Sequence, residues 1–92
     1  MIKIVKLTTG EELIADVERV DGKVSLKKPA AIQLMPSQTN PQQIMVGLFP
    51  YAQYAQNHGI DVAESFIVWE STPVDDLYNQ YNSMFGSGIQ LV

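Results

Sequence analysis

The Asp21-Gly22 dipeptide is the feature that most restricts how this chain can fold. It stands between two segments whose apolar residues alternate, residues 11–20 and residues 23–28. Asp-Gly in such a position indicates a two-residue hairpin turn, because a type I′ turn needs positive φ at both central residues. The sequence therefore predicts two antiparallel strands on either side of this turn.

The segments around this hairpin predict two further features. Residues 2–7 are rich in β-branched side chains and end at a Thr-Thr-Gly turn cluster, which is typical of a first strand. The apolar pattern after Asp21-Gly22 continues to Met35, so the third strand is expected to be long. Pro29 lies inside it and predicts a bend or an edge position, because proline cannot donate a ladder hydrogen bond.

The second half of the chain predicts two more strands. Residues 44–49 are almost wholly apolar, which fits a strand that is buried on both faces or paired at an interface. Residues 65–71 form the fifth predicted strand. Residues 36–43 predict a polar loop with two prolines, and residues 51–59 fit either a loop or a short helical turn.

A helix over residues 73–85 is the clearest single element. Thr72 can cap it, Pro73 suits its first turn, and Gly86 stands where helices end. The apolar residues recur at helical spacing: Val74, Leu77, Tyr78, Tyr81, Met84 and Phe85. The tail, residues 86–92, is expected to add a short strand or to pack on a neighbour.

These elements predict a mostly β protein, with residues 1–92 as a single domain. Strands and helix do not alternate as βαβ units would, so we expect a small, strongly bent, five-stranded antiparallel barrel with a C-terminal α-helix. A five-stranded sheet has long edges, which must be covered, closed or paired with another chain.

Charge is distributed unevenly along the chain. The net charge is −4, yet all six Lys and Arg residues lie within the first 28 positions. An anion contact is therefore expected on the N-terminal hairpin, although solvated strand faces guarded by lysine explain the same pattern. The absence of cysteine excludes disulfides, thiolate zinc clusters and a catalytic thiol. With neither a signal peptide nor a membrane-length apolar run expected, we predict a cytoplasmic protein.

No residue pattern predicts an enzyme. His58 is the only histidine, and no serine stands in a nucleophile-elbow context. Glu11 and Glu12 are expected to point to opposite faces of a strand, so they cannot share acid–base work. We therefore expect no cofactor, no metal, no membrane contact and no small-molecule substrate.

Residues 51–58 contain flat rings and amides that suit a binding role. The candidates are Tyr51, Tyr54, Asn57 and His58. Such groups can stack on nucleobases and bond to their edges without net charge. They can equally serve to pack and order the loop.

The stretch VKLTTGEELIADVERVDGKVSL, residues 5–26, resembles the first signature of the Sm and Sm-like (LSm) proteins. The positions that match are Leu7, Gly10, Val17, Asp21, Val24, Ser25 and Leu26. Ser25 stands where that family usually has asparagine, its second signature (an Arg-Gly or Lys-His step) is missing, and the helix follows the barrel instead of preceding it. The whole sequence also resembles small marine cyanophage proteins that carry such a barrel.

The resemblance implies a homo-oligomeric ring, in which the strand at 44–49 of one subunit pairs with the strand at 65–71 of the next. It also implies RNA contact from two loops. By position, the first loop supplies Asp21, Lys23 and Ser25, and the second supplies residues around Asn57 and His58. The sequence thus supports a ring that binds RNA or single-stranded DNA. The alternative is a structural or protein-interaction barrel, such as one in a phage assembly, that binds no nucleic acid.

Overall fold

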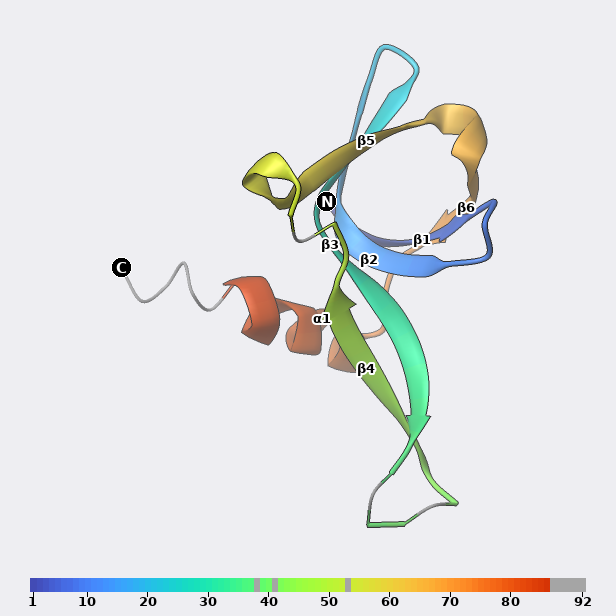
Figure 1. Ribbon diagram of the computed structural model, residues 1–92, viewed down its shortest axis with the longest axis vertical. Coiled ribbons are helices and arrows are strands. Elements are labelled where there is room, and N and C mark those ends of the chain that lie inside the picture. The colour runs from blue at the N-terminus through green and yellow to red at the C-terminus, as the bar shows by residue number, and fades with distance from the viewer. Residues whose placement is uncertain (38, 41, 53, 87–92) are drawn as a thin grey trace.

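An antiparallel sheet forms most of the chain, in a computed structural model that describes residues 1–37, 39–40, 42–52 and 54–86 (Figure 1). The strand order is β4-β3-β2-β1-β6, and β5 pairs with β3 away from this path. The prediction of a mostly β fold is therefore confirmed. The strands are β1 (Ile2–Leu7), β2 (Glu12–Val20), β3 (Lys23–Pro36), β4 (Ile44–Pro50), β5 (Gly59–Ala63) and β6 (Ile67–Ser71).

Strand β3 is long and bends where proline predicted it. Ile14 pairs with Ala30 and Asp16 pairs with Lys27, so Lys28 and Pro29 together oppose the single residue between Ile14 and Asp16. Two residues against one form a β-bulge, which bends the strand and increases its twist. The half of β3 before the bulge pairs with β5, and the half after it pairs with β4. Strand β3 therefore connects the part of the sheet that contains β5 to the part that contains β4.

The sheet curves strongly and stays open. Strand β5 leads through a 3₁₀ turn, η2 (Glu64–Phe66), into β6, and Figure 1 shows these segments arching around β1 and β2. Among the described strands, no ladder joins β5 to β6. The predicted fifth strand at 65–71 is shorter than expected because η2 occupies its start. Strand β5 was not predicted, since its residues follow the ambiguous segment 51–59.

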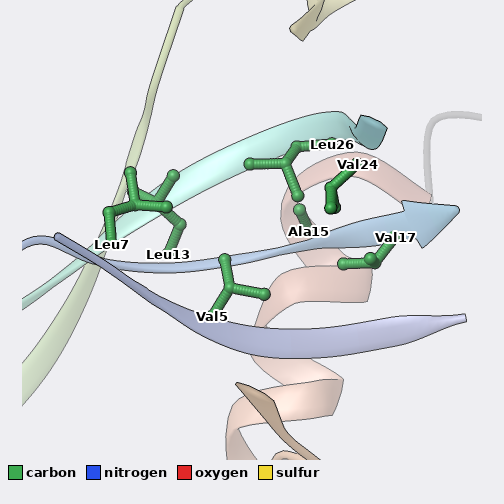
Figure 2. Packing of buried hydrophobic residues seen from close by; sticks show 7 residues of the cluster. All are labelled: Val5, Leu7, Leu13, Ala15, Val17, Val24 and Leu26. Carbon is green, nitrogen blue, oxygen red and sulfur yellow. The ribbon is translucent and has the colours of Figure 1, made fainter. Parts of the chain in front are cut away.

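The main core lies between β1, β2 and the first half of β3. Figure 2 shows its side chains gathered between these strands, and the strand alternation predicted for 11–20 places three of them on one face. Ile60, Val62, Phe66 and Ile67 pack against this cluster from β5, η2 and β6. The buried members are Val5, Leu7, Leu13, Ala15, Val17, Val24 and Leu26.

The C-terminal helix covers the opposite face of the sheet. Helix α1 (Asp75–Tyr81) continues as a π-helical turn, η3 (Asn82–Gly86), so the predicted helix is confirmed in place. Its Tyr81 is buried with Ile14 and Ala30. The predicted cap is wrong: Val74 occupies the N-cap position, while Thr72 Oγ1 accepts a hydrogen bond from Lys3 Nζ at 3.0 Å. Of the predicted tail, residues 87–92 lie outside the described residues.

The second half of β3 and strand β4 form a two-stranded ribbon that extends along the 46 Å long axis (Figure 1). Residues 44–49 were expected to be buried on both faces or paired at an interface. The first alternative is wrong, because most of these side chains are exposed within the single chain: Ile44, Met45, Val46 and Phe49. The ribbon is therefore an apolar surface, and the interface alternative stays a prediction.

Candidate nucleic-acid interface

The three residues predicted for the first loop, Asp21, Lys23 and Ser25, lie where β2 meets β3, and we call them the turn group. Asp21 and Gly22 have φ values of 51° and 80°, so both central residues adopt the positive φ that a type I′ turn needs. Lys23 and Ser25 follow on β3 and border an open hollow of about 380 Å³. Its lining residues are Glu18, Val20, Asp21, Lys23, Ser25 and Asp61. The hollow thus joins the three predicted residues with an aspartate from β5.

The electrostatics of this hollow do not suit a phosphate. Three carboxylates, from Glu18, Asp21 and Asp61, line it beside the single ammonium of Lys23. A phosphate that approached Lys23 would meet a net negative surface, and phosphate contacts supply most of the affinity of nucleic-acid binding. The Glu18 carboxylate is partly neutralised by Lys27 Nζ at 2.8 Å, but both side chains are exposed to solvent. The turn group therefore favours a cation or a hydrogen-bond donor over a polyanion.

Residues of the second predicted group lie in the connection between β4 and β5. This connection ends in a 3₁₀ turn, η1 (Gln56–His58), directly before β5. The Tyr51 ring packs against the main core, and its hydroxyl donates to Glu11 Oε1 at 3.0 Å. Burial and this hydrogen bond raise the pKa of Tyr51. Tyr51 therefore holds the loop in place, which is the packing role that the sequence left open.

Tyr54 and His58 remain accessible in the same connection. The Tyr54 side chain is 94% exposed, the highest value among the large apolar residues described. His58 is exposed, has a φ of 51°, and its backbone N–H donates to the Ala55 carbonyl at 3.0 Å. The side chain of Asn57 lies outside the described part of the structure. Tyr54 thus offers a free ring face on which a base can stack.

Lys28 is a cation beside this group that the sequence did not single out. It is the residue after Lys27, which pairs with Gly59, so its backbone lies next to His58 at the end of the β3–β5 ladder. Within the described residues it makes no ion pair or hydrogen bond through its ammonium group. The bulge at Pro29 places it there, and its only sequence signal is a lysine before a proline in a bent strand. The backbone of a lysine therefore lies next to the end of the connection that carries Tyr54.

The two predicted groups do not meet within one chain. Lys23 pairs with Ala63 at one end of the β3–β5 ladder, and Lys27 pairs with Gly59 at the other. Four residue steps along a strand separate the ends by roughly 13 Å. The turn group instead meets η2, since the Glu64 N–H donates to the Gly22 carbonyl at 3.2 Å. The loop directly before the last strand is therefore η2, and not the segment around His58.

Arg19 fixes η2 against the sheet. Its Nε donates to Glu64 Oε1 and Oε2, both at 3.0 Å, and its Nη2 donates to Glu70 on β6. The hydrogen bond and charge of Arg19 lower the pKa of Glu70 below its usual 4.5. Sequence reasoning missed this triad, because its members are separated by 45 and 51 residues. These ion pairs connect β2 to η2 and β6, in the region where no ladder joins β5 to β6.

The Glu70→Gln variant is expected to lose less stability in acid than the wild type. The ionised Glu70 carboxylate contributes stability above pH 4.5, and this contribution is lost as pH falls through the lowered pKa of the folded state. Urea unfolding at several pH values between pH 7 and about pH 3 measures the free energy of unfolding of both proteins. At neutral pH the variant should be the less stable protein, and the two curves should converge in acid. Parallel curves would show that the ionisation of Glu70 contributes nothing to the stability of the folded state.

The structure offers no metal centre in the residues it describes. Across residues 1–37, 39–40, 42–52 and 54–86, no cluster of three or more His, Cys, Asp or Glu side chains is placed to hold an ion. None of the helices in that part of the chain is long and apolar enough to cross a membrane. No protein-family model matches the chain, and no curated protein matches it significantly.

Proposed function

We propose that this chain is a cytoplasmic, non-enzymatic Sm-like subunit that assembles into a homo-oligomeric ring and binds RNA or single-stranded DNA. The observation that carries the proposal is the pair of open sheet edges. In the described part of the chain, β4 is paired with β3 alone and β6 with β1 alone. Open edges of this kind need a partner, since unpaired backbone groups recruit other strands.

The two edges complement each other. Both carry exposed apolar side chains, including Val46 and Phe49 on β4 and Val68 and Trp69 on β6. Pairing β4 of one copy with β6 of the next uses two different surfaces, so the contact repeats head to tail, and it forms a ring when the rotation between copies closes. The strong curvature of the sheet and the β5–η2–β6 arch support a small bent barrel as the repeating unit.

Nucleic acid binds this ring through Tyr54, His58 and Lys28, which we call the loop group. Tyr54 provides a stacking face, and Lys28 provides a cation for the phosphate backbone. The acidic hollow around Lys23 contributes specificity through Ser25 and Asp21 rather than through charge. Each contact is weak by itself, and a ring repeats it in every subunit, so avidity offsets the net negative charge.

The Tyr54→Ala variant is expected to bind short single-stranded oligonucleotides more weakly. Stacking of one base on an aromatic ring contributes about 1–3 kcal/mol, which corresponds to a loss of about 5- to 150-fold in affinity. Fluorescence anisotropy with labelled RNA and DNA oligonucleotides at low salt measures the change. Tyr78→Ala is the matched control, because Tyr78 is an exposed tyrosine on α1, outside the loop group. Equal affinities of the two variants would exclude Tyr54 as a stacking site.

Light scattering tests the ring itself. The solution mass of the protein should be a fixed multiple, greater than one, of the 10.2 kDa chain, and an oligonucleotide should add only its own mass. A monomer at all concentrations would overturn the proposal.

A second function is a structural or protein-interaction module without nucleic-acid affinity. The three carboxylates around Lys23 favour it, since they oppose a polyanion at one of the two predicted loops. It predicts the same ring mass and no oligonucleotide binding at low salt.

A further inference from the structure

The ladder registers show which side chains share a face of the sheet. Residues that lie directly opposite each other in paired strands point to the same side. Ile4 pairs with Ile14, Ile14 with Ala30, and Lys6 with Trp69. Helix α1 packs on the face that contains Ile14 and Ala30, so we call this the helix face. By alternation from Ile4 to Lys6, Trp69 also lies on the helix face.

The same reasoning extends along the ribbon. Ala30 is followed at two-residue spacing by Ile32, which pairs with Leu48, and by Leu34, which pairs with Val46. Pro36 then pairs with Ile44. All of these residues lie on the helix face, like Trp69 at the far edge of the sheet. The helix face thus has apolar side chains at both of its open edges.

Helix α1 covers the middle of the helix face and reaches β4 at Val46, whose carbonyl accepts a hydrogen bond from Gln80 Nε2 at 3.1 Å, but it leaves apolar side chains exposed near both edges. Ile14 and Ala30 under the helix are fully buried. On the ribbon, Leu34 of β3 and Ile44 of β4 are each 69% exposed, and Val46 of β4 is 38% exposed. At the β6 edge, Trp69 is 44% exposed. Figure 1 shows the helix passing beside β4, while β6 lies next to β1 at the opposite edge of the sheet.

The ribbon has no ionised side chain that could solvate it. From Pro29 to Ile60 the sequence contains no acidic or basic residue except His58. The core of a protein–protein interface is likewise depleted of charge and enriched in aromatic residues. An isolated two-stranded ribbon is marginally stable in water, so this ribbon needs another surface against it.

We propose that Trp69 of each copy packs on Val46 of the next copy, beside Ile44 and Leu34 of that same next copy. This contact covers the interface between β6 of one copy and β4 of the next, which we call the joint. This inference rests on the proposed ring. Strand pairing between copies continues the sheet, so side chains of the helix face stay on the same side across the joint. Neighbouring strands lie about 4.8 Å apart, and opposed side chains have Cβ atoms about 5 Å apart. Trp69 is the central residue of β6, so it meets the middle of the ribbon edge.

A second copy of this chain is the occupant because its own edges supply both halves of the contact. The β6 edge offers one large ring on the helix face, and the β4 edge offers the exposed side chains of Ile44 and Val46 on the same face. Beside Trp69, Lys6 Nζ lies 3.4 Å from Glu12 Oε2, so the charges next to the ring are already paired. Trp69 therefore brings no unpaired charge into the joint, and on the β4 side the Asp76 carboxylate of α1 lines the same hollow as Val46.

Trp69 is the only tryptophan in the chain, so its fluorescence reports directly on this contact. The experiment uses the full chain and records emission, acrylamide quenching and light scattering on the same samples. Assembled protein should show blue-shifted emission and several-fold weaker quenching than a monomeric variant. This readout needs no substitution in the joint of the assembled sample, so a folding defect cannot produce it.

The Val46→Asp variant supplies the monomer. An aspartate at this position places an unpaired charge under Trp69, so both the assembly and the emission shift should be lost. Val20→Asp is the matched control, because Val20 is an exposed valine at the end of β2 and lies at neither open edge. Circular dichroism confirms that both variants fold.

The outcomes separate this inference from the proposed function. A ring whose Trp69 stays as accessible to acrylamide as in the Val46→Asp variant would overturn the Trp69 contact and leave the ring intact. A ring that persists in Val46→Asp would overturn it as well. A wild-type chain that is monomeric at every concentration would overturn the ring and the contact together.

Discussion

The Tyr81→Ala variant is expected to detach helix α1 from the sheet. The Tyr81 side chain is 3% exposed and joins the helix to Ile14 and Ala30. Its hydroxyl donates to the carbonyls of Lys28 at 2.9 Å and Lys27 at 3.3 Å, directly at the bulge. Deletion of a buried aromatic ring costs about 3–5 kcal/mol, which is a large part of the stability of a domain this small. Urea unfolding followed by far-UV circular dichroism measures the loss.

Two further tyrosine variants identify the cause. Tyr78→Ala removes an exposed ring from the same helix and should change stability by less than about 0.5 kcal/mol. Tyr81→Phe keeps the ring and removes the hydroxyl, so it should cost about 1–3 kcal/mol.

Burial raises the pKa of Tyr81 to about 12 from 10.0, so the folded state keeps this proton while the unfolded state loses it.

The stability advantage of the wild type over Tyr81→Phe should therefore shrink between pH 10 and pH 12. An advantage that stays constant over this range would show that the hydroxyl is not buried. Equal losses in Tyr81→Ala and Tyr78→Ala would show that the helix is not held by Tyr81.

The Leu26→Ala variant is expected to lose about 2–5 kcal/mol of stability. Leu26 is fully buried in the main core, where strands β1, β2 and β3 leave little freedom to fill a cavity. Leu34→Ala is the matched control on the same strand, and its side chain is exposed. Both are compared in the Val46→Asp background, so that assembly does not contribute to the measured free energy. A similar loss in both variants would place the main core elsewhere.

Elements with local signals could be predicted from the sequence. The alternation of residues 11–20, the Asp21-Gly22 turn and the bend at Pro29 each depend on near neighbours in the chain, and the structure confirms them. Strand β5 depends instead on pairing with Lys23–Lys27, far earlier in the sequence. No local pattern predicts that partner, nor the turn η2 that separates β5 from β6. The exposure of β4 was also unpredictable, because an apolar run does not reveal which of its faces is covered.

The candidate site also contains some features that have local sequence signals and others that depend on distant strand pairing. The positions of Asp21, Lys23 and Ser25 at a hairpin turn follow from the sequence. The acidic character of their surroundings does not, because Asp61 reaches the hollow through the β3–β5 ladder. Lys28 likewise comes to lie beside His58 through the bulge and the ladder together. The chemistry of both loops is thus set by tertiary pairing.

The uncharged ribbon has a consequence for the response of this protein to ionic strength. At 0.1 M salt, counter-ions largely screen interactions between exposed charges that are more than about 10 Å apart, and added salt weakens phosphate binding steeply. Between Pro29 and Ile60 there is no Lys, Arg, Asp or Glu whose charge could be screened. A joint made from this ribbon would hold at salt concentrations that release an oligonucleotide from Lys28. In the proposed ring, added salt should therefore release the oligonucleotide before it separates the subunits.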